Sequence, residues 1–224
     1  MGNIITLSFF YLIGIVILLG FNELNYRRFK IKGEITRKFA HFASIIAVIP
    51  MPYMIESHWY VLGLALIFFA GLYFTQQTKQ LKSIHDIKRK SVGSYLLPLS
   101  IYITFLASSY LENKFIYILP MLILAICDPM AAILGMNIKK YNNQVVLFGR
   151  KYQKTWLGTG AFVSMSFVIS LIAIYYYRGV FDIKTFWLSA IIAIIGAMSE
   201  LFSWRGSDNL SIPVSIACIL LIFL

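Results

Sequence analysis

Residues 115–136 read FIYILPMLILAICDPMAAILGM, an apolar run in which Asp128 is the only residue charged at neutral pH. A helix that crosses a bilayer needs about 20 consecutive, mostly apolar residues. An acidic side chain inside such a helix is costly in hydrocarbon, and it marks a functional position by default. The run therefore predicts a membrane-spanning helix that carries part of a functional site.

The composition extends this prediction to the whole chain. Of the 224 residues, 59% are hydrophobic and only 13% are charged, and the mean hydropathy is +0.77. Soluble domains carry about 25% charged residues, so the chain is predicted to be an integral membrane protein. We expect a single membrane domain over residues 1–224, because the apolar runs follow one another too closely for a soluble domain. Runs of spanning length lie at 4–21, 39–55, 59–75, 92–111, 115–136, 157–177 and 185–203.

The last apolar run, 210–224, is short and has Pro213 near its start. It is compatible with a thin eighth span, a half-span or a packed segment, and we expect a span. The runs lack the alternating pattern of outer-membrane strands, so the predicted fold is an all-α, polytopic bundle of seven to eight spanning helices. The first run lacks a basic leader and a clear cleavage site, so we expect it to be retained as a helix.

The placement of basic residues predicts the orientation of the bundle. If the loops alternate sides, seventeen of the twenty Lys and Arg residues fall on one side of the membrane. This bias predicts an outside N-terminus and a cytosolic face that carries the long basic loops, as in a bacterial inner membrane. The net charge of +11 then suits membrane lipids rather than nucleic acid as the partner. The basic connections are 22–38, 76–91, 137–156 and 204–209.

The stretch Glu34–His41 places a cation and an imidazole on one helix face. Arg37 and His41 are four residues apart, which is the spacing of neighbours on a helix surface. Arg offers a planar fork of donors, and His can donate or transfer a proton, so the pair suits phosphate. The alternative is an orienting Arg beside a packed His.

Two further stretches, 88–95 and 148–161, place cations before hydroxyl residues and glycines where a span begins. Backbone amides at a helix start attract phosphate when cations lie beside them. Taken alone, the first stretch is a weak signal, because basic residues commonly flank membrane helices and glycine is frequent in them. The residues concerned are Lys90, Ser91 and Gly93 in the first stretch, and Lys154, Thr155 and Gly158 in the second.

Asp128 is followed directly by Pro129. Proline removes an amide donor and frees a backbone carbonyl, while small residues in the next turn allow close approach of another helix or a ligand. A carboxylate beside freed carbonyl oxygens suits Mg²⁺, which takes one or two protein carboxylates and fills its other positions with water and phosphate. The alternative is a structural ion pair with Lys or Arg.

The stretch 199–213 places Glu200, Asp208 and Asn209 between two apolar segments. They lie on the same predicted side as Arg37 and Lys154. Acids and cations gathered at one face favour binding of a metal ion together with a polyphosphate.

The motifs in this order resemble those of the polyprenol/phytol/dolichol kinase family, which includes CTP-dependent diacylglycerol kinases. The resemblance covers about residues 34–215. Leu157 stands where relatives generally have a glutamate, Pro129 stands where a small or hydroxylated residue is expected, and the chain between Gly135 and Lys154 is longer or more divergent. The motifs are Arg37-Lys38 with His41; Lys90-Ser91 with Gly93-Ser94; Asp128 with Ala131-Ala132 and Gly135; Lys154-Thr155-Trp156 with Gly158; and Glu200 with Asp208-Asn209-Leu210 and Ile212-Pro213.

The resemblance implies an Mg²⁺-dependent kinase. Such an enzyme moves the γ-phosphoryl group of a nucleoside triphosphate, often CTP and alternatively ATP, onto the hydroxyl of a lipid alcohol such as phytol, a polyprenol, dolichol or diacylglycerol. It also implies a relation to the phosphatidate cytidylyltransferases. Phosphoryl transfer asks mainly for positioning and charge neutralisation, which cations, a metal ion and a base can supply.

The expected roles follow from these motifs. The general base is Asp128, Glu200 or His41, and the sequence leaves the choice open. We expect Mg²⁺ to be bound by Asp128, Asp208 and Asn209, with Glu200 nearby. The residues expected to bind the nucleotide phosphates are Arg37, Lys38, Lys90, Ser91, Gly93, Lys154, Thr155 and Gly158.

Two other functions remain open from the sequence. Cytidylyl transfer from CTP to a lipid phosphate would use the same residues and release pyrophosphate. A transporter of an anionic solute would use Asp128 and Pro129 in a broken helix, although no inverted repeat is evident in the chain. The products distinguish the two enzymes, and uptake without lipid phosphorylation would indicate the transporter.

Overall fold

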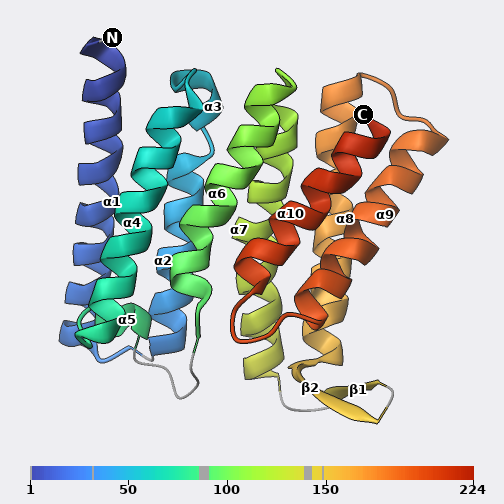
Figure 1. Ribbon diagram of the computed structural model, residues 1–224. Helices are drawn as coiled ribbons and strands as arrows, with labels where there is room; N and C mark the ends of the chain where they lie inside the picture. The colour runs from blue at the N-terminus through green and yellow to red at the C-terminus, as the bar shows by residue number, and fades with distance from the viewer. Residues whose placement is uncertain (1, 32, 86–90, 139–142, 148) are drawn as a thin grey trace.

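The computed structural model describes residues 2–31, 33–85, 91–138, 143–147 and 149–224, and this part of the chain forms a helical bundle (Figure 1). Two short helices, α3 (Met51–Met54) and α5 (Lys82–His85), lie in connections between long ones. The long helices are α1 (Gly2–Phe29), α2 (Gly33–Val48), α4 (His58–Gln77), α6 (Gly93–Tyr110), α7 (Phe115–Asn137), α8 (Trp156–Arg178), α9 (Ile183–Leu201) and α10 (Asp208–Phe223).

The helices follow the predicted apolar runs in order, and the all-α class is confirmed. By length and composition, α1, α4, α7, α8 and α9 are long and apolar enough to cross a membrane. Helices α2 and α10 have 16 residues each, which gives about 24 Å against a hydrocarbon core of about 30 Å. The chain is an integral membrane protein, while the number of spans and the outside N-terminus stay predictions.

Helix α7 forms the centre of the bundle. It packs against α2, α6, α8 and α10, and its residues Leu119, Met121, Ile123 and Leu124 are fully buried. A helix that is apolar all round is expected to be largely covered, and 56% of the most apolar stretch of α7 is buried. Among the candidate membrane spans, Asp128 therefore lies in the one with the largest buried share, in the C-terminal half of α7 (Phe115–Asn137).

Local sequence signals set the ends of α8 and α9. The Thr155 hydroxyl accepts a hydrogen bond from the Gly158 amide at 3.2 Å, and α8 ends at Gly179 with φ +69°. Asp182 caps α9 by accepting from the Thr185 amide at 2.8 Å. Its carboxylate also accepts two hydrogen bonds from Arg178, at 2.5 and 2.8 Å. Side-chain caps satisfy amides that have no partner inside the helix, so both helices begin at defined residues.

A β-hairpin that the sequence did not predict lies between α7 and α8. Strands β1 (Gln144–Leu147) and β2 (Arg150–Thr155) pair antiparallel around Gly149, whose φ of +74° suits the turn. The hairpin occupies the stretch between Gly135 and Lys154 that departs from the family pattern. Strand β2 runs directly into the cap of α8, so it fixes the position of Lys154.

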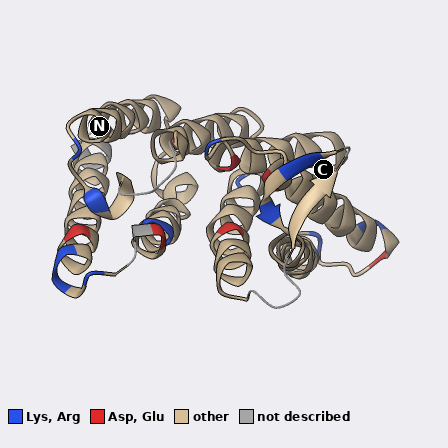
Figure 2. Cartoon of the chain, turned by 90° about the horizontal axis from the view of Figure 1, so that it is seen from below, with Lys and Arg blue, Asp and Glu red and all other residues tan. Residues whose placement is uncertain are grey.

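One end of the bundle carries the hairpin, α5 and the connections that contain many of the basic residues (Figure 2). Both chain termini lie toward the other end (Figure 1). The polar stretches identified in the sequence thus meet at a single end of the described structure.

Candidate active site

Asp128 is buried in α7, with 1% of its surface exposed. Its Oδ2 atom lies 2.6 Å from Lys38 Nζ and 3.6 Å from His41 Nε2, both from α2. Its Oδ1 atom is buried and has no hydrogen-bond partner among the described residues. Pro129 cannot donate to the carbonyl of Ala125, one turn earlier. Asp128 therefore presents a free anionic oxygen inside the protein.

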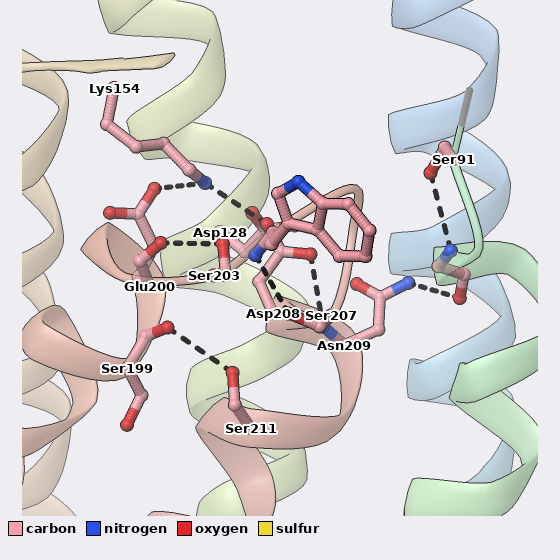
Figure 3. Close-up of polar contacts among 12 residues, drawn as sticks. Ser91, Asp128, Lys154, Ser199, Glu200, Ser203, Ser207, Asp208, Asn209 and Ser211 are labelled. Atoms are coloured by element: carbon pink, nitrogen blue, oxygen red, sulfur yellow. Dashed lines mark hydrogen bonds and ion pairs between the residues drawn. The ribbon is translucent and has the colours of Figure 1, made fainter. Parts of the chain in front are cut away.

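A second ionic cluster joins β2, α9 and α10 (Figure 3). Lys154 Nζ lies 2.5 Å from Glu200 Oε1 and 3.1 Å from Asp208 Oδ2. The exposed fractions are 3% for Glu200 and 6% for Asp208. Burial alone would lower the pKa of Lys154, but the carboxylates of Asp208 and Glu200 raise it above its usual value. Lys154 is thus held as a cation.

The charged groups of the two clusters and the nearby Arg37 sum to zero formal charge. The three carboxylates of Asp128, Glu200 and Asp208 are matched by three cations, those of Lys38, Lys154 and Arg37. Buried charges are tolerated when they are paired and hydrogen-bonded. Glu200 Oε2, however, is buried without a hydrogen-bond partner in the described structure, as is Asp128 Oδ1. Two unsatisfied carboxylate oxygens in one buried site indicate a place for a cationic ligand.

Arg37 and Ser91 join the start of α6 to α2. Arg37 NH2 donates to Ser91 Oγ at 2.9 Å, and this hydroxyl also accepts from the Gly93 amide at 3.3 Å. Arg37 NH1 is buried without a hydrogen bond and lies 3.9 Å from Glu34 Oε2. Gln76 Nε2 donates to the Ser91 carbonyl at 3.0 Å. One guanidinium nitrogen thus fixes the loop, while the other is available to an anion.

Asn209 connects α10 to the same loop. Its Nδ2 donates to the Gly93 carbonyl at 2.7 Å (Figure 3), and its amide donates to Asp208 Oδ1 at 3.1 Å. Both oxygens of Asp208 therefore already accept hydrogen bonds, the second one from Lys154. This arrangement gives Asn209 a positioning role, and its predicted role as a metal ligand stays a prediction.

Gly206 and Gly93 let the α9–α10 turn approach the start of α6. Gly206 has φ +90°, and a Cβ atom there would lie 2.5 Å from Ser91 Oγ. A Cβ atom on Gly93 would lie 2.7 Å from the Gly206 carbonyl oxygen. The Val92 amide donates to the Arg205 carbonyl across this contact at 2.8 Å. Sequence reasoning missed Gly206, although a glycine two residues before Asp208 was a signal for a tight turn.

Thr155 and Gly158 bring α8 close to α7. A Cβ atom on Gly158 would lie 2.9 Å from the Ala131 carbonyl oxygen, and one on Gly135 would lie 2.8 Å from Thr155 Oγ1. These contacts give the predicted motif a packing function. Phosphate binding by Thr155 and Gly158 stays a prediction.

The remaining sequence-predicted residues fall into two groups. Lys38, predicted to bind phosphate, is paired with Asp128, whereas Lys90 lies outside the described residues. Within the described ranges, no three His, Cys, Asp or Glu side chains come together as a ready metal site. Mg²⁺ needs only one or two protein carboxylates, and the free oxygens of Asp128 and Glu200 fit that requirement better than Asp208 does.

The chain is similar to a known enzyme over most of its length. The chain is 29% identical over 188 residues to a phytol kinase from the cyanobacterium Synechocystis, and the match covers 84% of this chain and 78% of the relative. The similarity to this phytol kinase extends over most of the chain. The matched length is long enough to include most of the site described above. No protein-family model matches the chain, and no solved structure matches it.

Proposed function

We propose that this protein is a membrane kinase that transfers the γ-phosphoryl group of a nucleoside triphosphate, with CTP favoured, to the hydroxyl of a lipid alcohol. The observation that carries the proposal is the pair of buried carboxylates, Asp128 and Glu200, each with one free oxygen beside Lys38, Lys154 and Arg37. The similarity to a phytol kinase supports the same class of reaction.

The cations of the site would bind the triphosphate. Lys38 and Lys154 are paired with carboxylates, and an incoming polyphosphate would share these ammonium groups. Arg37 NH1 has no hydrogen bond, so it can donate to a phosphate oxygen while NH2 keeps its bond to Ser91. Charge-assisted hydrogen bonds of this kind are short and strong. The basic loops concentrate nucleotide near the site through their field.

The free oxygens of Asp128 and Glu200 would hold Mg²⁺, with Asp208 oriented beside them by Lys154 and Asn209. When bound, Mg²⁺ neutralises charge that develops on the phosphoryl oxygens. The protein's own part is to keep the two carboxylates buried and in place, so that little reorganisation is needed during the reaction.

Among the three predicted bases, the geometry favours His41. Its Nε2 atom has no hydrogen-bond partner and lies 3.6 Å from Asp128 Oδ2. In the proposed step, the alcohol oxygen bonds to the γ-phosphorus and the bond to the β-phosphate oxygen breaks. The hydroxyl proton passes to His41, and the nucleoside diphosphate leaves with the bonding electrons. Asp128 stabilises the resulting imidazolium.

The site is proposed to face the cytosol of a bacterial cell membrane. Seventeen of the twenty Lys and Arg residues fall in connections that belong to one side if the loops alternate. The hairpin, which carries Lys154, and the turn between α9 and α10, which joins Glu200 to Asp208, lie at one end of the bundle (Figure 1). A cytosolic location would also give the site access to nucleoside triphosphates.

A product assay with two labels tests the proposal. Purified protein in nanodiscs receives Mg²⁺, α- or γ-labelled CTP or ATP, and geranylgeraniol, phytol, dolichol or diacylglycerol. A kinase moves only the γ-label into the lipid fraction, and Asp128→Asn abolishes this transfer, whereas Asp182→Asn, outside the site, retains it. Transfer of the α-label to a lipid phosphate would indicate cytidylyl transfer. Absence of transfer from either label would overturn the proposal.

A further inference from the structure

A hollow lies between α1, α2, α4 and α6. Arg37, His41 and Asn209 line one end of it, and its walls are otherwise almost entirely apolar. The cavity volume of the hollow is about 90 Å³, so it is a narrow groove rather than a wide chamber. A polar end at the catalytic cluster and apolar walls match the chemistry of an amphiphile.

The depth of the hollow can be measured along two helices. Its lining extends from Arg37 to Val48 on α2, and from Leu72 to Val61 on the antiparallel helix α4. Each stretch rises about 16 Å, at about 1.5 Å per residue. An extended chain advances about 1.2 Å per bond, so this depth takes about 13 carbon–carbon bonds. Met51 of α3, which is 2% exposed, lines the far end.

His41 connects the hollow to the carboxylate cluster. It lines the polar end, and its Nε2 atom lies 3.6 Å from Asp128 Oδ2. A hydroxyl at this end would thus lie beside the base and the free oxygen of Asp128, while its tail would extend between apolar walls.

We propose that this hollow binds the single hydrocarbon tail of the acceptor alcohol and sets its length. The preferred acceptor has one tail with a main chain of about 12–16 carbons, as the depth dictates. Dolichol is too long for the hollow, and diacylglycerol brings two tails and a wider head. The phosphorylation of the bound alcohol rests on the proposed function, but the binding of the tail does not.

Substitutions along α4 test how far the tail extends into the hollow. Ala65 lines the hollow seven residues from Leu72, so Ala65→Trp leaves about 10 Å, or about 8 bonds. This variant is expected to lower geranylgeraniol phosphorylation about tenfold or more relative to the shorter geraniol. Val61→Phe, at the far end of the hollow, is a milder change. It shortens the hollow by the space of only the last few carbons of the tail. The control Leu66→Trp lies on the outer face of the same helix, where Leu66 is 58% exposed.

Binding is measured separately from catalysis by photo-crosslinking with a diazirine-bearing geranylgeraniol analogue. Peptides of α2, α4 and α6 should be labelled in the unmodified protein and in Leu66→Trp, and labelling should fall in Ala65→Trp and Val61→Phe. Size-exclusion profiles and melting temperatures show that each variant is folded. Labelling without kinase activity would support the tail site and overturn the proposed function. Equal labelling and equal chain-length preference in all folded variants would overturn the tail site, whether or not the protein is a kinase.

Discussion

The two halves of the bundle differ in how completely they are covered. In the most apolar stretch of each helix, 56% of residues are buried in α7 and 44% in α9, against 6% in α1 and 17% in α4. The α7–α10 half contains the buried carboxylates and the close approach of α7 and α8, whereas the α1–α6 half contains the hollow. The half with the buried ion pairs is suited to hold phosphates, and the less buried half with the apolar hollow is suited to accept a lipid. Arg37 and His41, on α2, lie where the halves meet.

After the loss of transfer expected for Asp128→Asn, the largest effect is expected for Glu200→Gln, in the α7–α10 half. The change removes one of the two carboxylates proposed for Mg²⁺ but keeps the size of the side chain. We expect the transfer rate to fall at least about a hundredfold, as when one preorganised electrostatic partner is removed. Titration of kinase activity with Mg²⁺ should also show a higher metal requirement. An unchanged rate and an unchanged Mg²⁺ dependence would remove Glu200 from the site.

Removal of the cation between Glu200 and Asp208 should destabilise the same half. Lys154→Met leaves two buried carboxylates without their partner, at a cost of about 3–5 kcal/mol. Unfolding in mixed micelles measures the loss, and Lys184→Met, in the first turn of α9, is the control. Because the folded pKa of Lys154 is raised, its stabilising effect is complete at neutral pH and is lost only as pH rises above about 10.4. The free energy of unfolding of the unmodified protein and of Lys154→Met should differ by the same amount at neutral and mildly alkaline pH. A difference that changes over this pH range would contradict this assignment.

Glycine substitutions test the close contact between α7 and α8. Gly158→Ala would place Cβ 2.9 Å from the Ala131 carbonyl oxygen, and such overpacking costs about 1–3 kcal/mol. Gly160→Ala is the matched control, because a Cβ atom there meets nothing within 4 Å and alanine favours a helix by up to about 1 kcal/mol. Melting temperatures in detergent should move in opposite directions. A similar shift in both variants would show that the contact does not limit packing.

A smaller effect is expected at the boundary between the halves. Arg37→Lys keeps the charge but cannot hold Ser91 and a phosphate oxygen with two nitrogens at once. The KM for nucleotide should rise about tenfold, which corresponds to about 1.4 kcal/mol, with a smaller change in kcat. A fall in kcat at unchanged KM would instead show that Arg37 contacts the phosphate only in the transition state.

The sequence predicted the helical membrane fold because apolar runs of spanning length are a strong local signal. It also identified Arg37, His41, Asp128, Glu200 and Asp208, since charged or polar residues in apolar segments stand out. The partners were not predictable: the pairing of Lys38 with Asp128 depends on how α2 packs against α7. The hairpin was missed because its short strands are polar and lie in a connection, and Gly206 because its role depends on the distant Ser91.

The central claim is that Asp128, at the meeting point of the two halves, supports phosphoryl transfer to a lipid alcohol. The most direct measurement is the time course of label transfer from γ-labelled CTP to geranylgeraniol, with unmodified protein and Asp128→Asn in matched nanodiscs containing Mg²⁺. The unmodified protein should form labelled prenyl phosphate steadily, and Asp128→Asn should form none. Equal formation by folded Asp128→Asn, or no formation by either protein, would contradict it.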